Sequence, residues 1–223
     1  MKISKLVPVA LIAAVCSVAS ASATAGQAKS SKRSMTHNDA APMLKQDMRK
    51  LWTDHVVWTR DYIVAAVGDQ PDAQAAAGRL MKNQEDIGNA VAKFYGAPAG
   101  QQLTTLLKQH ISIAVDLIKA AKAGDKAAQQ QADSKWQQNG VEIADFLSKA
   151  NPNWPRATLV DMMKKHLATT TDEVVARLTK NWDGDVRAFD AVYDHILHMS
   201  DALSDGIVKQ FPDKFGMSTT ASR

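Results

Sequence analysis

The stretch LLKQHISIAVDLIKAA, residues 106–121, decides the fold. It carries His110 in the middle of an apolar stripe, and the apolar residues of that stripe recur every three or four positions. This spacing predicts an amphipathic helix that turns one face to a core. A histidine in the middle of such a face is a buried polar group, and it needs a partner.

The same pattern occurs twice more. LWTDHVVWTRDYIVAA (51–66) holds His55, which lies 55 residues before His110, and MMKKHLATTTDEVVAR (162–177) holds His166, which lies 56 residues after it. A period of this size with helical patterning inside it is typical of a repeated helix pair. We therefore predict an internal repeat of about 56 residues, each copy being an antiparallel helical hairpin.

Clusters of glycine and proline divide the chain between these helices, because neither residue favours a continuing helix. They are GDQPD (68–72), YGAPAG (95–100), ANPNWP (150–155) and NWDGD (181–185). The hairpins are predicted at 42–95, 101–150 and 156–211, within a helical bundle that covers 39–215. No β-hairpin signal is present in the sequence, so the predicted class is all-α, a six-helix bundle.

The N-terminus is predicted to be a signal peptide over residues 1–25. Lys2 and Lys5 precede an apolar run, and small residues follow it at a site suited to signal peptidase. We expect a flexible polar tail at 26–38, a short C-terminal tail at 216–223, and a periplasmic or secreted protein. No stable membrane span is expected after cleavage, and the oligomeric state is left open.

Charge argues against nucleic acid as a partner. Five of the 27 basic residues precede Asp39, so the remaining 22 nearly balance the 23 acidic residues. A near-neutral body lacks the basic face that binds phosphates. Cys16 is the single cysteine and would leave with the signal peptide, so thiol chemistry is excluded from the mature protein.

Counting outward from each hairpin turn places six polar residues at one height of the bundle. Equal distance from the turn means equal height in antiparallel helices. The six are His55, Asn83, His110, Asn139, His166 and His195. Asp86, Glu142 and His198 lie one helical turn away, at the i+3 spacing that brings side chains close.

Such a layer has three interpretations. It is a buried hydrogen-bond network, a transition-metal site for zinc, iron, copper or nickel, or a pocket for an organic ligand. The metal hypothesis takes His55, His110, His166 and His195 as ligands, with Asp86, Glu142 and His198 as supporting or alternate ligands. The pocket hypothesis adds an anion-binding fork from Arg60 and apolar walls from four residues, which are Trp58, Tyr62, Trp136 and Met199.

The sequence does not identify a catalytic residue. It has no P-loop, no GxGxxG after a strand, no GxSxG and no HExxH. The di-iron Glu-x-x-His pair is also missing, and His195-Ile-Leu-His198 is a weak substitute.

Four runs resemble a group of uncharacterised bacterial secreted helical-bundle proteins with an HxxWTR stretch. They are HVVWTRDYI (55–63), KNQEDIGNAVAKFYG (82–96), LLKQHISIAVDLIKAAKAGD (106–125) and LSDGIVKQFPDKF (203–215), and the likeness extends over about 42–215. The resemblance implies a helical fold and an exported or peripheral location, and it implies no activity.

We therefore expect an exported binding protein whose central layer holds a transition metal or a small ligand. The first alternative is a structural or partner-binding bundle in which the layer is only a hydrogen-bond network. The second alternative is a metal-dependent enzyme.

Overall fold

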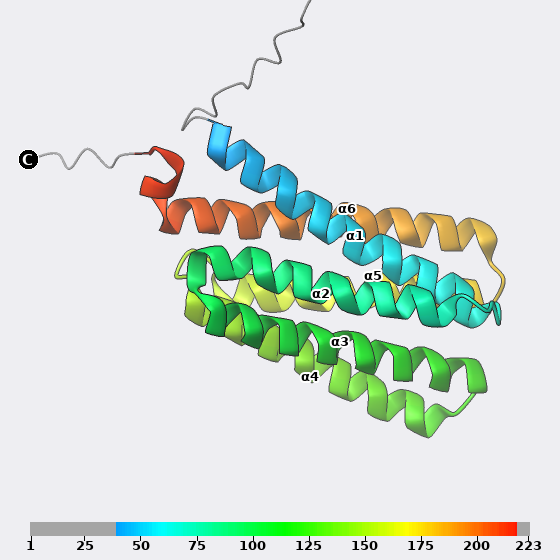
Figure 1. Cartoon of the computed structure of the whole chain (residues 1–223). Coiled ribbons are helices and arrows are strands. Elements are labelled where there is room, and N and C mark those ends of the chain that lie inside the picture. Colours follow the sequence, from blue (N-terminus) through cyan, green and yellow to red (C-terminus); the bar gives the residue numbers. More distant parts are fainter. Residues whose placement is uncertain (1–38, 218–223) are drawn as a thin grey trace, which may run out of the picture. The chain divides into compact units, whose positions relative to one another are not determined.

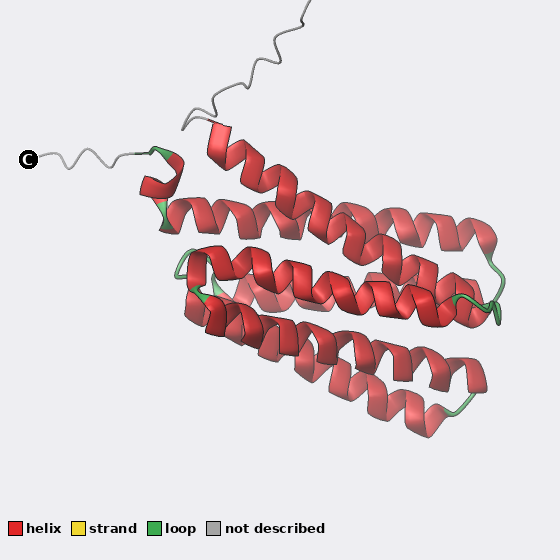
Figure 2. Ribbon diagram, in the orientation of Figure 1, coloured by secondary structure: helices red, strands yellow, loops and turns green. Residues whose placement is uncertain are grey.

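The computed structural model describes residues 39–217, and these form an all-α bundle (Figures 1 and 2). The helices are α1 (Ala40–Val67), α2 (Ala73–Tyr95), α3 (Ala97–Ala123), α4 (Lys126–Ala150), α5 (Arg156–Leu178) and α6 (Trp182–Gln210), followed by the short 3-10 helix η2 (Pro212–Phe215). The predicted signal peptide, the polar tail at 26–38 and the last six residues of the C-terminal tail lie outside the described residues.

Consecutive helices run antiparallel and pack side by side, and α6 returns to pack against α1 (Figure 1). The helices therefore form a closed ring around one core, as the prediction of a six-helix bundle requires. The contact between α2 and α3 is as extensive as the contacts within the three hairpins. The hairpin as a repeated unit stays a prediction, because the packing does not set the hairpins apart.

Two breaks in the chain are shorter than the sequence indicated. Helix α3 begins at Ala97, so Pro98 lies in its first turn, where proline is tolerated, and Gly96 alone connects α2 to α3 with φ of 87°. Helix α6 begins at Trp182, because the Asn181 side chain caps it by accepting a hydrogen bond from the Gly184 N–H at 3.0 Å. Both segments were predicted as turns.

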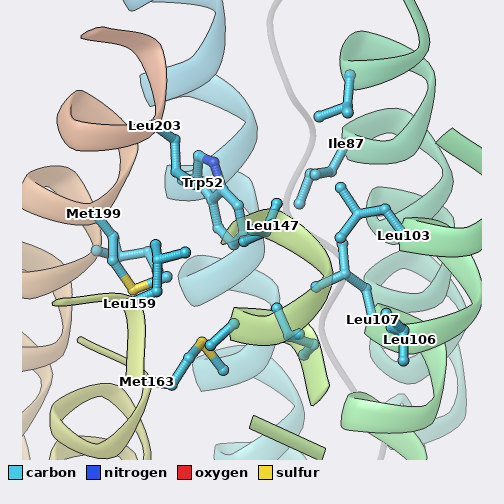
Figure 3. Packing of buried hydrophobic residues seen from close by; sticks show 14 of the residues in the cluster. Trp52, Ile87, Leu103, Leu106, Leu107, Leu147, Leu159, Met163, Met199 and Leu203 are labelled. Carbon is cyan, nitrogen blue, oxygen red and sulfur yellow. The ribbon is translucent and has the colours of Figure 1, made fainter. Parts of the chain in front are cut away.

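The interior is packed with large aliphatic and aromatic side chains from all six helices. Trp52, Leu107 and Met163 meet there, together with the other labelled residues of Figure 3. Ile63, Ile87 and Ile196 are completely buried. This core supplies the driving force for folding, since each such side chain contributes about 1.5–3 kcal/mol on burial.

Small residues hold α2 and α3 close together. A Cβ atom placed on Gly88 would lie 1.9 Å from Thr104 Oγ1 and 2.7 Å from the carbonyl oxygen of Gly100. A Cβ on Gly100 would lie 2.6 Å from Ala92 Cβ. The backbones therefore approach closely on this side of the ring, whereas α4 and α5 share the sparsest of the contacts between consecutive helices. No described helix is both long enough and apolar enough to cross a membrane.

Candidate functional site

The predicted histidine layer is the central polar feature of the structure. His166 on α5 lies between three other imidazoles, with ring centroids 5.8 Å from His55, 5.9 Å from His110 and 6.5 Å from His195. His55, His110 and His166 are 3%, 2% and 5% exposed, so all three are buried. The four histidines therefore meet at one depth, as the spacing in the sequence predicted.

His110 has both ring nitrogens engaged. Its Nδ1 lies 2.8 Å from Asn139 Oδ1, and its Nε2 accepts a hydrogen bond from Trp136 Nε1 at 3.1 Å. The indole can only donate, so the proton of the neutral imidazole is on Nδ1 and is donated to Asn139. Asn139 in turn donates to the carbonyl oxygen of Leu106. This arrangement fixes the tautomer and the orientation of His110.

His55 is held differently. Gln84 Nε2 lies 3.3 Å from His55 Nδ1, and the same amide donates to the carbonyl oxygen of Leu80 and to Asn83 Oδ1. Asn83 is oriented by its own donation to the carbonyl oxygen of Leu51. The amide nitrogen of Gln84 has only two hydrogens, which it donates to the oxygens of Leu80 and Asn83, so its contact with Nδ1 does not determine the tautomer of His55.

His166 is the least satisfied of the four. Its Nδ1 is buried without a hydrogen-bond partner among the described residues. His195 is only partly buried, and its Nε2 donates to the carbonyl oxygen of Met162 at 2.8 Å. An unpaired buried polar group costs about 1–3 kcal/mol. The centre of the cluster therefore keeps hydrogen-bonding capacity that the protein itself does not use.

All four imidazoles are neutral at physiological pH. Burial lowers the pKa of His55 to about 3 and that of His110 to about 4. Burial, with the neighbouring imidazoles, holds the pKa of His166 well below its usual value, and burial also lowers the pKa of His195. Neutral imidazoles can each donate one hydrogen bond, accept one, or bind a metal.

Three of these histidines form the floor of a deep cleft between α1, α3, α4 and α5. The cleft has a volume of about 680 Å³. Its walls are mostly apolar, and its rim carries Lys126, Gln129 and Thr179 beside the α3–α4 and α5–α6 turns. The floor lies roughly 20 Å from the rim along α5, at about 1.5 Å per residue. The apolar wall residues are Ile111, Ala114, Leu117, Ile118, Val174 and Leu178.

A second cavity of about 30 Å³ lies on the core side of the same three histidines. It is lined almost entirely by apolar side chains, including Trp52, Leu107 and Met163 (Figure 3). The imidazoles therefore stand between an open cleft and the sealed core. Their position makes them the polar end of the cleft.

The other predicted ligands are not brought to this cluster. Asp86 is paired with Lys82 at 2.9 Å, Glu142 is exposed and accepts from Gln138, and His198 is exposed on α6. A step of three residues turns a helix by about 300°, which leaves these side chains at the edge of the inward face. Among the described residues, no group of three or more His, Cys, Asp or Glu is placed to hold a metal ion. Metal binding stays a prediction.

Of the residues predicted to contact an organic ligand, Trp136 lines the cleft and Met199 lines the small cavity on its core side, whereas the other three do not line the cleft. Trp58 lies under the guanidinium of Arg79, 5.5 Å from its ring centroid, and Tyr62 packs in a small apolar cluster at the α1–α2 end. The fork of Arg60 binds a carboxylate of this chain, because both of its terminal nitrogens contact Asp185, at 3.0 and 2.9 Å.

Arg60 belongs to a buried ion-pair cluster that joins three helices. It also contacts Glu173 at 2.8 Å, while Arg177 contacts Asp185 at 3.1 Å. Glu173 is 1% exposed, and burial raises the pKa of its carboxyl to about 7 against the opposing effect of Arg60. The guanidinium of Arg60 lies over the ring of Phe189 at 4.7 Å. This cluster ties α1 to α5 and α6.

The sequence did not identify Gln84 as a partner of a histidine, and it predicted Trp136 only as an apolar wall of a ligand pocket. Gln84 is completely buried and holds His55, although it adjoins Asn83, which was predicted. Trp136 is 3% exposed and donates to His110. Its place one turn before Asn139 on the inward face of α4 was a signal that could have identified it as a partner of His110.

The fold and site define this protein as a six-helix bundle with an apolar cleft that ends on buried histidines. In comparisons with protein-family models, curated proteins and solved structures, nothing matches this chain. Its resemblance to exported helical bundles stays an expectation.

Proposed function

We propose that this protein binds a small, mostly apolar organic molecule in the cleft above His55, His110 and His166. The observation that carries the proposal is the joint presence of an apolar cleft of about 680 Å³ and a polar floor with unused hydrogen-bonding capacity. Ligand sites of small molecules are typically apolar cavities of about 300–1,000 Å³ with a few polar groups that orient the ligand.

Two further observations support binding over a purely structural layer. A layer that served only to fix the register of the bundle would be expected to satisfy its own polar groups, as His110 does. His166 Nδ1 has no partner, and the apolar cleft beside it exposes Val175, which is 49% exposed. A ligand would cover that apolar surface and occupy the space above the floor.

The test uses N-phenylnaphthylamine, an uncharged probe whose fluorescence rises in apolar sites. We expect saturable binding to the purified protein. Ala114→Trp fills the cleft with an indole and should weaken probe binding at least about tenfold, since it removes the space for the probe. Ala127→Trp makes the same change at an exposed position on α4 and serves as the control.

Circular dichroism and thermal unfolding establish that both variants keep the helical fold. Binding that is unchanged in Ala114→Trp, or absent from the unmodified protein for a panel of uncharged aromatic molecules, would remove the proposal. Loss of binding in Ala127→Trp as well would show that the probe sits elsewhere.

A further inference from the structure

The small cavity on the core side of the histidines has both nitrogen and sulfur in its lining. Besides apolar carbon, its walls carry imidazole rings and the thioether side chains of methionines. The imidazoles are those of His55, His110 and His166, and the thioethers are those of Met48, Met163 and Met199. Both groups bind transition metals, and thioether sulfur favours Cu(I) among them. The cavity therefore gathers side chains that suit a soft metal ion.

Three of these side chains are placed to act as ligands. His166 has a buried Nδ1 without a partner, and burial holds the pKa of His166 well below its usual value, so the ring is neutral. Met163 precedes His166 by three residues on α5, a spacing that puts both on neighbouring parts of one helix face. Met199 comes from α6, which packs against α5, and Figure 3 shows its sulfur and that of Met163 in the packed interior.

The other two imidazoles serve as walls of the cavity. Trp136 and Asn139 occupy both nitrogens of His110, and the amide of Gln84 contacts Nδ1 of His55. The histidines alone therefore do not form a metal site, in agreement with the missing group of His, Cys, Asp or Glu ligands among residues 39–217. The methionine sulfurs supply the ligands that such a group lacks.

Charge at the cavity selects a monovalent ion. Among the described residues that line it, none is charged. A divalent ion would lose a large hydration energy there and would meet no anionic ligand in return, whereas a monovalent ion loses much less. The space of about 30 Å³ is enough for a water-sized guest, and a bare copper ion is smaller than that. The same histidines line the open cleft, which provides a path of entry.

We propose that the cavity binds one soft monovalent cation, Cu(I) or its analogue Ag(I), through Nδ1 of His166 and the sulfur atoms of Met163 and Met199. The indole of Trp52 lines the same cavity and adds an aromatic ring, a group that attracts cations. This inference goes beyond the proposed function. A metal at Nδ1 leaves the ring proton on Nε2, so His166 keeps one hydrogen-bond donor.

The experiment uses Ag(I), which needs no reductant, in isothermal titration calorimetry of the full chain in a chloride-free buffer. Every protein carries Cys16→Ser, which removes the only thiol of the chain. We expect one tight Ag(I) site per chain and much weaker binding of Zn(II). For the Cu(I) complex, X-ray absorption at the copper K edge should show scattering from sulfur.

Met163→Leu and Met199→Leu each replace the sulfur and nearly keep the volume, a change that packed cores tolerate. Each should weaken Ag(I) binding at least about tenfold, and the double variant should lose the sulfur signal of copper. Met43→Leu is the matched control, because Met43 is 41% exposed and does not line the cavity. Its affinity for Ag(I) should equal that of the parent protein. Circular dichroism and thermal unfolding establish that the variants keep the fold.

Three results would overturn the inference. They are an unmodified protein without a tight Ag(I) site, an affinity that is the same in all the variants, and a copper spectrum without sulfur. Zn(II) that bound as tightly as Ag(I) and responded to the same variants would also contradict it, since the site would then not select a soft monovalent ion. These outcomes are independent of N-phenylnaphthylamine binding, so the proposed function stands or fails separately.

Discussion

At the scale of single residues, the histidine cluster shows how one residue type takes different roles in one layer. His110 is locked by an indole on one nitrogen and an amide on the other, so it supports the floor and offers nothing to a ligand. His55 is contacted at Nδ1 by the amide of Gln84, and His166 has a buried Nδ1 without a partner. The differences come from which side chain faces each ring.

Burial of these rings makes the free energy of unfolding depend on pH. The unfolded chain protonates a histidine near pH 6.5, whereas folded His55 and His110 protonate only at about 3 and about 4. Their contribution to stability is therefore complete above pH 6.5 and is lost as the pH falls toward those values. Each contributes a slope of about 1.4 kcal/mol per pH unit within that range.

Glu173 has the opposite effect on the pH dependence of the free energy of unfolding, because its pKa of about 7 in the folded protein lies above its ordinary value of 4.5. It favours the folded state as the pH falls from about 7 to 4.5. The buried histidines outnumber Glu173, so we predict that urea titrations give a lower free energy of unfolding at about pH 5 than at about pH 7. In Glu173→Gln, which lacks the opposing effect of the carboxyl group, this free energy should fall more steeply as the pH is lowered. A protein that became more stable on acidification would contradict the buried, neutral state of the rings.

Some of these residue roles could be read from the sequence and others could not. The stride of 55 and 56 residues was enough to bring His55, His110 and His166 to one height. The sequence did not show that Asp86 and Glu142 fall at the edge of their helices, because the exact rotation of a helix is set by packing and not by spacing. It also did not show that Arg60 would bind Asp185, a pair separated by 125 residues.

At the scale of helices, α2 and α3 form the most extensive contact between any two helices of the ring. Gly88 and Gly100 let the two backbones approach closely, and Gly96 joins the helices with a single residue. Sequence analysis assigned the glycine and proline of 95–100 to a loop, because those residues usually interrupt helices. The structure uses them for a sharp reversal and a close packing contact instead.

Gly88→Ala tests this contact. The added methyl would meet Thr104 Oγ1 and the Gly100 carbonyl, so we predict a loss of about 1–3 kcal/mol in the free energy of unfolding, as for other overpacked sites. Gly78→Ala is the control in the same helix, where nothing lies within 4 Å of an added Cβ. There the substitution should stabilise the protein by about 0.5–1 kcal/mol. Chemical denaturation measures both, and equal effects would contradict the packing argument.

At the scale of the whole molecule, the cleft results from unequal packing around the ring. The helices α2 and α3 are tightly joined, whereas α4 and α5 share fewer contacts and leave space beside α3. The amphipathic pattern predicted the bundle, but it could not predict the cleft. Leu117 and Val174 line the cleft wall with the same residue types that fill a core.

The ion-pair cluster of Arg60 joins α1 to α5 and α6, so its removal should affect the whole fold. Arg60→Met leaves Glu173 and Asp185 buried without this partner, and we predict a loss of about 2–4 kcal/mol, somewhat below the cost for a fully buried pair because Arg60 is 22% exposed. Urea denaturation gives the loss, and Glu173→Gln in the same chain should recover part of it.

Lys50→Met is the control for that variant. Lys50 pairs with Asp54 at the surface with its side chain 71% exposed, so its loss should change stability by less than about 1 kcal/mol. A similar effect in both variants would show that Arg60 does not hold the three helices together.

The mouth of the cleft lies beside the turn at Gly124 and Asp125 and the turn at 179–181, far from the histidine floor. Surface turns tolerate insertions that a packed interior does not. Under the proposed function, lengthening these two turns would change which molecules can enter the cleft without altering the buried imidazoles. On that proposal, the residues that select a ligand by its size and shape are separate from the residues that orient it.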